Sequence, residues 1–122
     1  MAEKKILVVD DSSSIRALLK MALEDENYKV TLGEDGLDAL KYLDGTHFDL
    51  VITDLHMPNM NGLELIHEVR KMDWYKYTPI LFLTTETKTD LKIKAKKEGA
   101  TGWLTKPFDN EKLKRVVKRV LR

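Results

Sequence analysis

The sequence contains no cysteine, only three prolines and no long hydrophobic run. The lack of cysteine excludes disulfide bonds and thiolate chemistry, and it favours a reducing compartment. The first apolar run, Ile6 to Val9, is too short for the core of a signal peptide, and no segment reaches the length of a membrane span. We therefore expect a cytoplasmic protein.

An excess of charge of either sign is also missing, because 21 lysine and arginine residues face 20 aspartate and glutamate residues. This balance gives no general attraction to nucleic acids or to anionic membranes. No repeat and no linker rich in proline, glycine or serine divides the 122 residues. One globular domain over residues 1–122, present as a monomer, is the expected organisation.

Short apolar runs are present instead. Ile6 to Val9, Leu50 to Ile52 and Ile80 to Leu83 are typical of strands that are buried on both faces of a parallel sheet. Tyr28 to Leu32 and Gly102 to Leu104 are weaker strand candidates.

Five segments with helical spacing of apolar residues alternate with these runs. Their apolar residues are Ile15, Leu18, Leu19 and Ala22; Leu37, Leu40 and Leu43; Leu63, Ile66 and Val69; Leu91 and Ala95; and Leu113, Val116, Val117, Val120 and Leu121. The alternation predicts an α/β fold in which helices cover both faces of a parallel sheet, with right-handed crossovers. An antiparallel fold is disfavoured, because the dipeptides Asp35-Gly36 and Asn61-Gly62 lead into helices instead of joining strands.

Polar residues stand where the predicted strands end. Asp10 and Asp11 follow the first strand, and Asp54 follows the third. Thr84 stands at the end of the fourth strand and Lys106 after the fifth. Because the carboxyl ends of parallel strands share one edge of the sheet, we expect these five side chains to converge there.

The expected cluster restricts the chemistry. Three crowded carboxylates raise one another's pKa unless a cation joins them, and Mg²⁺ prefers such oxygen ligands together with water and phosphate. Lys106 and Thr84 offer a charge and a hydroxyl to phosphoryl oxygens. Asp54 is then a candidate nucleophile toward phosphorus, with an aspartyl phosphate as its product.

Other interpretations fit the same residues one at a time. Asp10, Asp11 and Asp54 can be cap or turn residues, Thr84 a strand residue and Lys106 a solvated lysine. Only the set of five at one edge favours a phosphoryl site.

Two other classes of protein fit less well. An aspartate-nucleophile phosphatase usually has a second acid two residues after its nucleophile, where this sequence has His56. A flavodoxin-like FMN carrier needs a phosphate loop rich in hydroxyls and glycine where Asp10 and Asp11 stand.

The sequence resembles bacterial response-regulator receiver domains over essentially its whole length. The residues that carry the resemblance are Ile6 to Asp11 (Ile-Leu-Val-Val-Asp-Asp), Asp54 with Met57-Pro58 and Asn61-Gly62, Thr84, and Lys106-Pro107-Phe108. The resemblance implies a flavodoxin-like (βα)5 three-layer sandwich with a five-stranded parallel sheet in the order 2-1-3-4-5.

The resemblance also implies a metal and phosphorylation site. Asp54 matches the phosphoacceptor and a ligand of Mg²⁺, and Asp11 matches a second ligand. Asp10 matches a ligand that acts through water, and the backbone carbonyl of His56 matches a further ligand. His56 and Glu86 stand where the family tunes the lifetime of the phosphoryl group.

Three further residues match the family's switch. Thr84 matches the hydroxyl that moves toward the phosphoryl group, and Lys106 matches the lysine that pairs with it. The peptide bond before Pro107 is expected to be cis. Trp103 matches an aromatic side chain that swings inward on activation, although plain core packing is an equally good interpretation.

The resemblance finally implies protein partners. We expect a sensor histidine kinase (CheA-like) as phosphoryl donor and, in chemotaxis, a flagellar motor switch protein (FliM-like) as target. A phosphorelay intermediate that serves a phosphotransfer domain is the alternative, and a fragment of a longer regulator is another. Because the last helix ends the sequence, we expect a switch that acts through its own surface and catalyses only its own phosphorylation and dephosphorylation. The basic side chains of the last helix are a solvated face or a partner surface, and they are Lys112, Lys114, Arg115, Lys118, Arg119 and Arg122.

Overall fold

The computed structural model describes residues 3–85 and 89–121. In sequence order, the described elements are β1 (Lys5–Val9), α1 (Ser13–Glu24), β2 (Lys29–Gly33), α2 (Gly36–Leu40), β3 (Leu50–Asp54), α3 (Gly62–Lys71), the 3₁₀ helix η1 (Asp73–Tyr75), β4 (Ile80–Thr84), α4 (Thr89–Glu98), β5 (Gly102–Thr105) and α5 (Asn110–Val120). Strands and α-helices therefore alternate five times, as the apolar pattern predicts.

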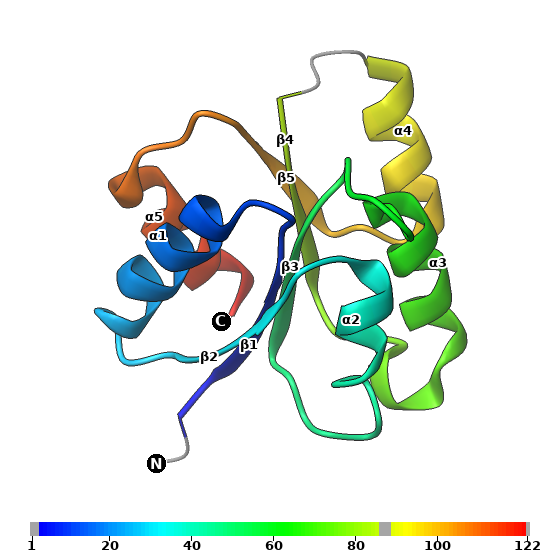
Figure 1. The fold of residues 1–122 in the computed structure, drawn as a ribbon, viewed down its shortest axis with the longest axis horizontal. Coiled ribbons are helices and arrows are strands. Elements are labelled where there is room, and N and C mark those ends of the chain that lie inside the picture. The colour runs from blue at the N-terminus through cyan, green and yellow to red at the C-terminus, as the bar shows by residue number, and fades with distance from the viewer. Residues whose placement is uncertain (1–2, 86–88, 122) are drawn as a thin grey trace.

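The five strands form one parallel sheet in the order β2-β1-β3-β4-β5. Helices α1 and α5 cover one face of the sheet, and α2, α3 and α4 cover the other (Figure 1). The predicted fold class and strand order are confirmed. In this topology every strand ends at the same edge of the sheet, which is the upper edge in Figure 1.

Two hydrophobic clusters hold the three layers together. Side chains alternate between the faces along a strand, so Ile6 and Val8 pack toward α1 and α5 whereas Leu7 and Val9 pack toward α2, α3 and α4. All five residues of β3 and of β4 are buried. Burial on both faces explains why the central strands are continuous apolar runs.

Helices α1, α3 and α5 start at polar capping residues that the preceding loops supply. The Ser12 hydroxyl accepts a hydrogen bond of 3.3 Å from the Ile15 amide at the start of α1. Asn61 and Glu64 form a reciprocal capping box at the start of α3. The Asp109 carboxylate caps α5 by accepting from the Lys112 amide. These caps fix where each strand-end loop turns into its helix.

The second helix is shorter than the spacing of Leu37, Leu40 and Leu43 predicts. α2 ends at Leu40, and the next turn continues with tighter bonds such as that from the Leu43 amide to the Leu40 carbonyl. Leu37 points outward, and the residues that α2 buries are Gly36 and Ala39. The small residues let α2 approach the sheet closely. Leu40 and Leu43 still pack against the core, so the stripe is wrong only about the end of the helix and about Leu37.

Gly62, the first residue of α3, lies against the end of β3, so replacing it with alanine should destabilise the fold. An added Cβ would lie 2.3 Å from the carbonyl oxygen of Asp54 and 2.8 Å from the Cα of Leu55. Because backbone atoms cannot move aside, we expect Gly62→Ala to lower the free energy of unfolding by about 3 kcal/mol.

Urea unfolding measures this effect, with Gly102→Ala as the matched control. The nearest atom to a Cβ at Gly102 is the flexible Leu81 Cδ2, at 3.4 Å. The control should unfold near the wild-type midpoint. Equal midpoints for the two variants would contradict the close contact at Gly62.

Candidate functional site

The upper edge of the sheet collects the carboxylates that the sequence predicts there. Asp10 directly follows β1, Asp11 comes next, and Asp54 is the last residue of β3. One carboxylate oxygen from each of the three lies within 4.8 Å of the others. Strand order explains the convergence, because β1 and β3 are neighbours in the sheet. The distance suits a shared cation.

The lysine that directly follows β5 enters this cluster. The Lys106 ammonium lies 2.8 Å from Oδ2 of Asp10 and 3.3 Å from Oδ2 of Asp54. Asp10 is fully buried, and its other oxygen accepts a hydrogen bond of 2.9 Å from the Ser12 amide. Both carboxylate oxygens of Asp10 therefore contact other groups of the protein. Asp11 is exposed, so the cluster is open to solvent on its side.

Burial and neighbouring charges shift the acidity of the site. Burial raises the pKa of Asp54, Lys106 opposes the rise, and the negative charge of Asp10 adds to it, so the pKa lies above its ordinary value. Burial alone would lower the pKa of Lys106, but the hydrogen bond to Asp10 and the charges of both carboxylates outweigh it and raise the pKa. The fold thus keeps Lys106 charged and makes Asp54 harder to ionise.

The loop that follows β3 is hydrogen-bonded to Asp54 and to the end of β4. The His56 amide donates a hydrogen bond to the Asp54 carboxylate, which lowers the pKa of Asp54 against the effect of burial. The Leu55 amide donates to the Leu83 carbonyl over 3.2 Å, and the Gly62 amide donates to the Leu55 carbonyl over 2.9 Å. This loop therefore places the backbone of His56 beside Asp54.

Thr84 and Lys106 are joined through their backbones at the ends of β4 and β5. The Lys106 amide donates to the Thr84 carbonyl over 2.7 Å, and the Thr84 side chain is fully buried. The bond between Lys106 and Pro107 is cis, as expected. All five strand-end residues of the sequence prediction therefore meet at one edge. Glu86 lies outside the described residues.

Comparison with known proteins identifies this arrangement. Residues 6–118 match the response regulator receiver domain. The chain belongs to the response regulator receiver family. Receiver domains are phosphorylation switches that bind Mg²⁺ at an acidic pocket, and this receiver resembles the CheY proteins of chemotaxis.

Three relatives show the extent of the likeness. The chemotaxis protein CheY of Pseudomonas aeruginosa is 38% identical over 117 residues, which are 95% of this chain and 94% of that protein. The crystallised chemotaxis protein CheY4 of Vibrio cholerae is 47% identical, with a TM-score of 0.95 over 98% of this chain and 100% of that one. The receiver domain of the P. aeruginosa sensor histidine kinase PA1611, solved with a magnesium ion in its active-site cleft, is 26% identical, with a TM-score of 0.90 over 98% of each chain.

Trp103 of the receiver lies at the surface and not in the core. Its side chain stacks on Phe82 with ring centroids 6.0 Å apart, yet the residue is 41% exposed. The Lys92 ammonium sits 5.0 Å from the centre of the indole, a cation–π contact between α4 and β5. Plain core packing therefore does not describe this tryptophan, and an inward movement stays a prediction.

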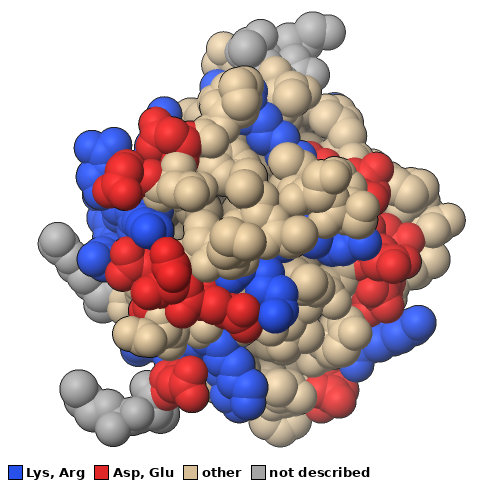
Figure 2. Space-filling view, turned by 60° about the vertical axis from the view of Figure 1, so that its left-hand side comes forward, with Lys and Arg blue, Asp and Glu red and all other residues tan. Residues whose placement is uncertain are grey.

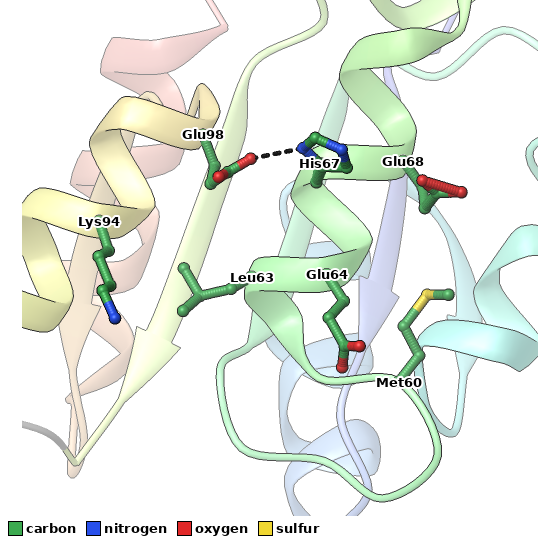
Figure 3. Close-up of a pocket in the computed structure, with 7 residues that line it drawn as sticks. All are labelled: Met60, Leu63, Glu64, His67, Glu68, Lys94 and Glu98. Atoms are coloured by element: carbon green, nitrogen blue, oxygen red, sulfur yellow. Dashed lines mark hydrogen bonds and ion pairs between the residues drawn. The ribbon is translucent and has the colours of Figure 1, made fainter.

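The two remaining histidines do not join the receiver's carboxylates. His47 lies 2.9 Å from Asp49, and His67 Nδ1 lies 2.7 Å from Glu98 Oε2. The His67 pair bridges α3 and α4 at one end of a cleft (Figure 3). The cleft is lined by Met60, Leu63, Glu64, His67, Glu68, Lys94 and Glu98. Both histidines therefore pair with carboxylates at the surface and lie outside the cluster.

Charges of both signs lie side by side on the face that carries α1 and α5 (Figure 2). Lys114 and Lys118 of α5 pair with Glu26 at 3.7 Å each. On α4, Lys92, Lys96 and Lys97 line a groove with Trp103.

Among the described residues, no helix is long and apolar enough to cross a membrane.

Proposed function

We propose that this chain, over residues 1–122, is a response regulator that a histidine kinase phosphorylates on Asp54 with the help of Mg²⁺. The observation that supports the proposal best is the joining of three carboxylates with Lys106 at the carboxyl edge of the sheet. Such a site suits phosphoryl transfer, which depends on positioning and on charge stabilisation more than on covalent chemistry by the protein.

The donor set fits magnesium. The three carboxylates offer hard oxygen ligands, and the exposed position of Asp11 leaves room for the water molecules that Mg²⁺ retains. Asp11, Asp54 and the His56 carbonyl would hold the ion directly, and Asp10 would act through water. The bound ion would supply positive charge to the transferring oxygens. The magnesium ion in the PA1611 receiver supports this assignment.

The remaining residues act on the phosphoryl group. A carboxylate oxygen of Asp54 attacks the phosphorus of a phosphohistidine, so that an O–P bond forms and the N–P bond to the imidazole breaks. Lys106 is already charged beside Asp54 and pairs with a phosphoryl oxygen. The Thr84 hydroxyl donates to another oxygen, and this movement carries the signal away from the site.

The output of the switch is a contact with a protein in the cytoplasm, with the flagellar motor switch as the target. The groove beside Trp103 combines an exposed Ile93 with Lys92, Lys96 and Lys97, so it fits an acidic segment with an apolar side. A relay role with a phosphotransfer partner, or a phosphatase activity, is less well supported, because two curated relatives that match along nearly their whole length are CheY proteins.

Intact mass after incubation with acetyl phosphate and Mg²⁺ tests the proposal. We expect one added phosphoryl group, lost when Mg²⁺ is withheld and lost or greatly slowed in Asp11→Ala, because each change removes the positive charge that the transferring oxygens need. Fluorescence followed in a Trp74→Phe background reports any linked movement of Trp103. Equal phosphorylation of wild type with and without Mg²⁺ would refute the metal's role. If acetyl phosphate adds no mass and beryllofluoride, an analogue of the phosphoryl group, also does not bind, the receiver chemistry is refuted.

A further inference from the structure

The loop between β3 and α3 is fastened to the start of α2. The Asn59 side-chain amide donates a hydrogen bond of 2.7 Å to Oδ2 of Asp35. The other oxygen of Asp35 accepts a hydrogen bond of 2.8 Å from the Asp38 amide and so caps α2. One carboxylate therefore serves both the helix and the loop.

A second contact lies beside the first. The Gly36 amide donates to the Met60 carbonyl over 3.2 Å. A Cβ added to Gly36 would lie 2.6 Å from Met60 Cγ, so the loop packs against the bare backbone of the helix. Asn59 adopts a positive φ of 66°, a conformation that asparagine tolerates better than most residues. The loop backbone is therefore shaped for this contact.

The same loop carries the His56 carbonyl. In Figure 1 it leaves the upper end of β3 and returns to α3. Its two ends are tied by the bonds from Leu55 to Leu83 and from Gly62 to Leu55. The contacts at Asn59 and Met60 hold the part between these ties, within four residues of His56.

We propose that Asp35 and Asn59 are positioning residues for the metal site. Their hydrogen bond, with the Gly36–Met60 contact, fixes the loop so that the His56 carbonyl is presented beside Asp54. The inference rests on the proposed function, in which this carbonyl is a ligand. Mg²⁺ demands near-ideal octahedral geometry, so a loosened loop weakens its binding even in a folded protein. Removal of a partner that hydrogen-bonds directly to a ligand typically costs about 10- to 100-fold in metal affinity, and Asn59, three residues from His56, is expected at the lower end of that range.

Calorimetric titration with Mg²⁺ tests the assignment in three variants. Asn59→Gly keeps the positive φ and removes the donor. Asp35→Ser keeps a capping oxygen for α2 and removes the acceptor. We expect each to weaken Mg²⁺ binding by about tenfold, and the double variant by no more than either single one, because both remove the same bond.

The matched control is Asn27→Gly, since Asn27 has a similar φ of 67° in the turn between α1 and β2, away from the site. Its Mg²⁺ affinity should equal that of wild type. Urea unfolding without Mg²⁺ should give nearly equal midpoints for wild type, Asn59→Gly and Asp35→Ser, which separates positioning from a general loss of stability.

Two outcomes would overturn the inference. One is wild-type Mg²⁺ affinity in both single variants, and the other is additive losses in the double variant. Wild type and Asp11→Ala, titrated in parallel, keep this failure distinct from failure of the proposed function. If wild type binds no Mg²⁺, or binds it no better than Asp11→Ala, the metal site itself is wrong.

Discussion

Replacing Asp54 with asparagine is expected to abolish phosphorylation by acetyl phosphate, because the amide lacks the nucleophilic carboxylate oxygen. The same replacement should make the protein more stable at neutral pH in the absence of Mg²⁺. The pKa of Asp54 is raised chiefly by burial, so the folded state favours its neutral form. Stability therefore falls as the pH rises from the unfolded pKa of Asp54 to its raised folded pKa, and the full loss is present at neutral pH. Asparagine carries no such charge.

Intact mass and urea unfolding on one preparation measure both effects. Asp73→Asn is the matched control, because Asp73 is exposed in η1 and outside the carboxylate cluster. The control should gain one phosphoryl group and keep the wild-type unfolding midpoint. Stoichiometric phosphorylation of Asp54→Asn would show that another residue is the acceptor. A lower midpoint would show that the ion pair with Lys106 outweighs burial of the charge.

Replacing Lys106 should have opposite effects on stability and on metal affinity. Its ammonium lies against two buried carboxylates, and loss of one partner of such a pair typically costs about 3–5 kcal/mol. We therefore expect Lys106→Met to destabilise the protein without Mg²⁺ by about 3 kcal/mol. The ammonium also repels a divalent cation, since unit charges about 4 Å apart interact by about 4 kcal/mol at an effective dielectric constant of about 20. Even part of that repulsion predicts Mg²⁺ binding about tenfold tighter than in wild type.

Unfolding in urea across a series of Mg²⁺ concentrations checks both expectations, since a ligand of the folded state stabilises it by mass action. Lys114→Met is the control, because Lys114 pairs with Asp25 and Glu26 of the α1–β2 turn and lies outside the cluster. Lys106→Met should still accept a phosphoryl group but signal poorly. Weaker Mg²⁺ binding in Lys106→Met would mean that the lysine arranges the ligands instead of competing with the cation.

Most of the fold is predictable, because strands that are buried on both faces of the sheet are continuous apolar runs in the sequence. Ile80 to Leu83 must be apolar at every position, so its strand is evident without knowledge of its neighbours. The end of α2 is not evident from the sequence. Leu43 continues the apolar stripe and is buried, but it lies in a turn beyond the helix. The helix η1 also escaped prediction, since three residues carry too little periodicity to reveal it.

The candidate site is predictable as far as strand ends determine it. Asp54 ends its strand and Asp10 and Lys106 directly follow theirs. The carboxyl ends of these strands share an edge, so the convergence of the three residues follows from the topology. The hydrogen bond between Asp35 and Asn59 does not follow, because it joins two loops whose separation depends on how closely α2 packs. The outward position of Trp103 likewise depends on side-chain packing, which the apolar pattern of a strand does not predict.

The late position of β5 in the sequence determines when the site is completed during synthesis of the chain. β5 is the last strand in the sequence and brings Lys106 to carboxylates from β1 and β3, up to 96 positions earlier. A chain still being synthesised on the ribosome therefore exposes its acids before their built-in counter-charge exists. Only a finished and fully docked polypeptide presents the complete set of groups. In the proposed function, a histidine kinase would therefore act on the complete fold and not on chains that are still being synthesised.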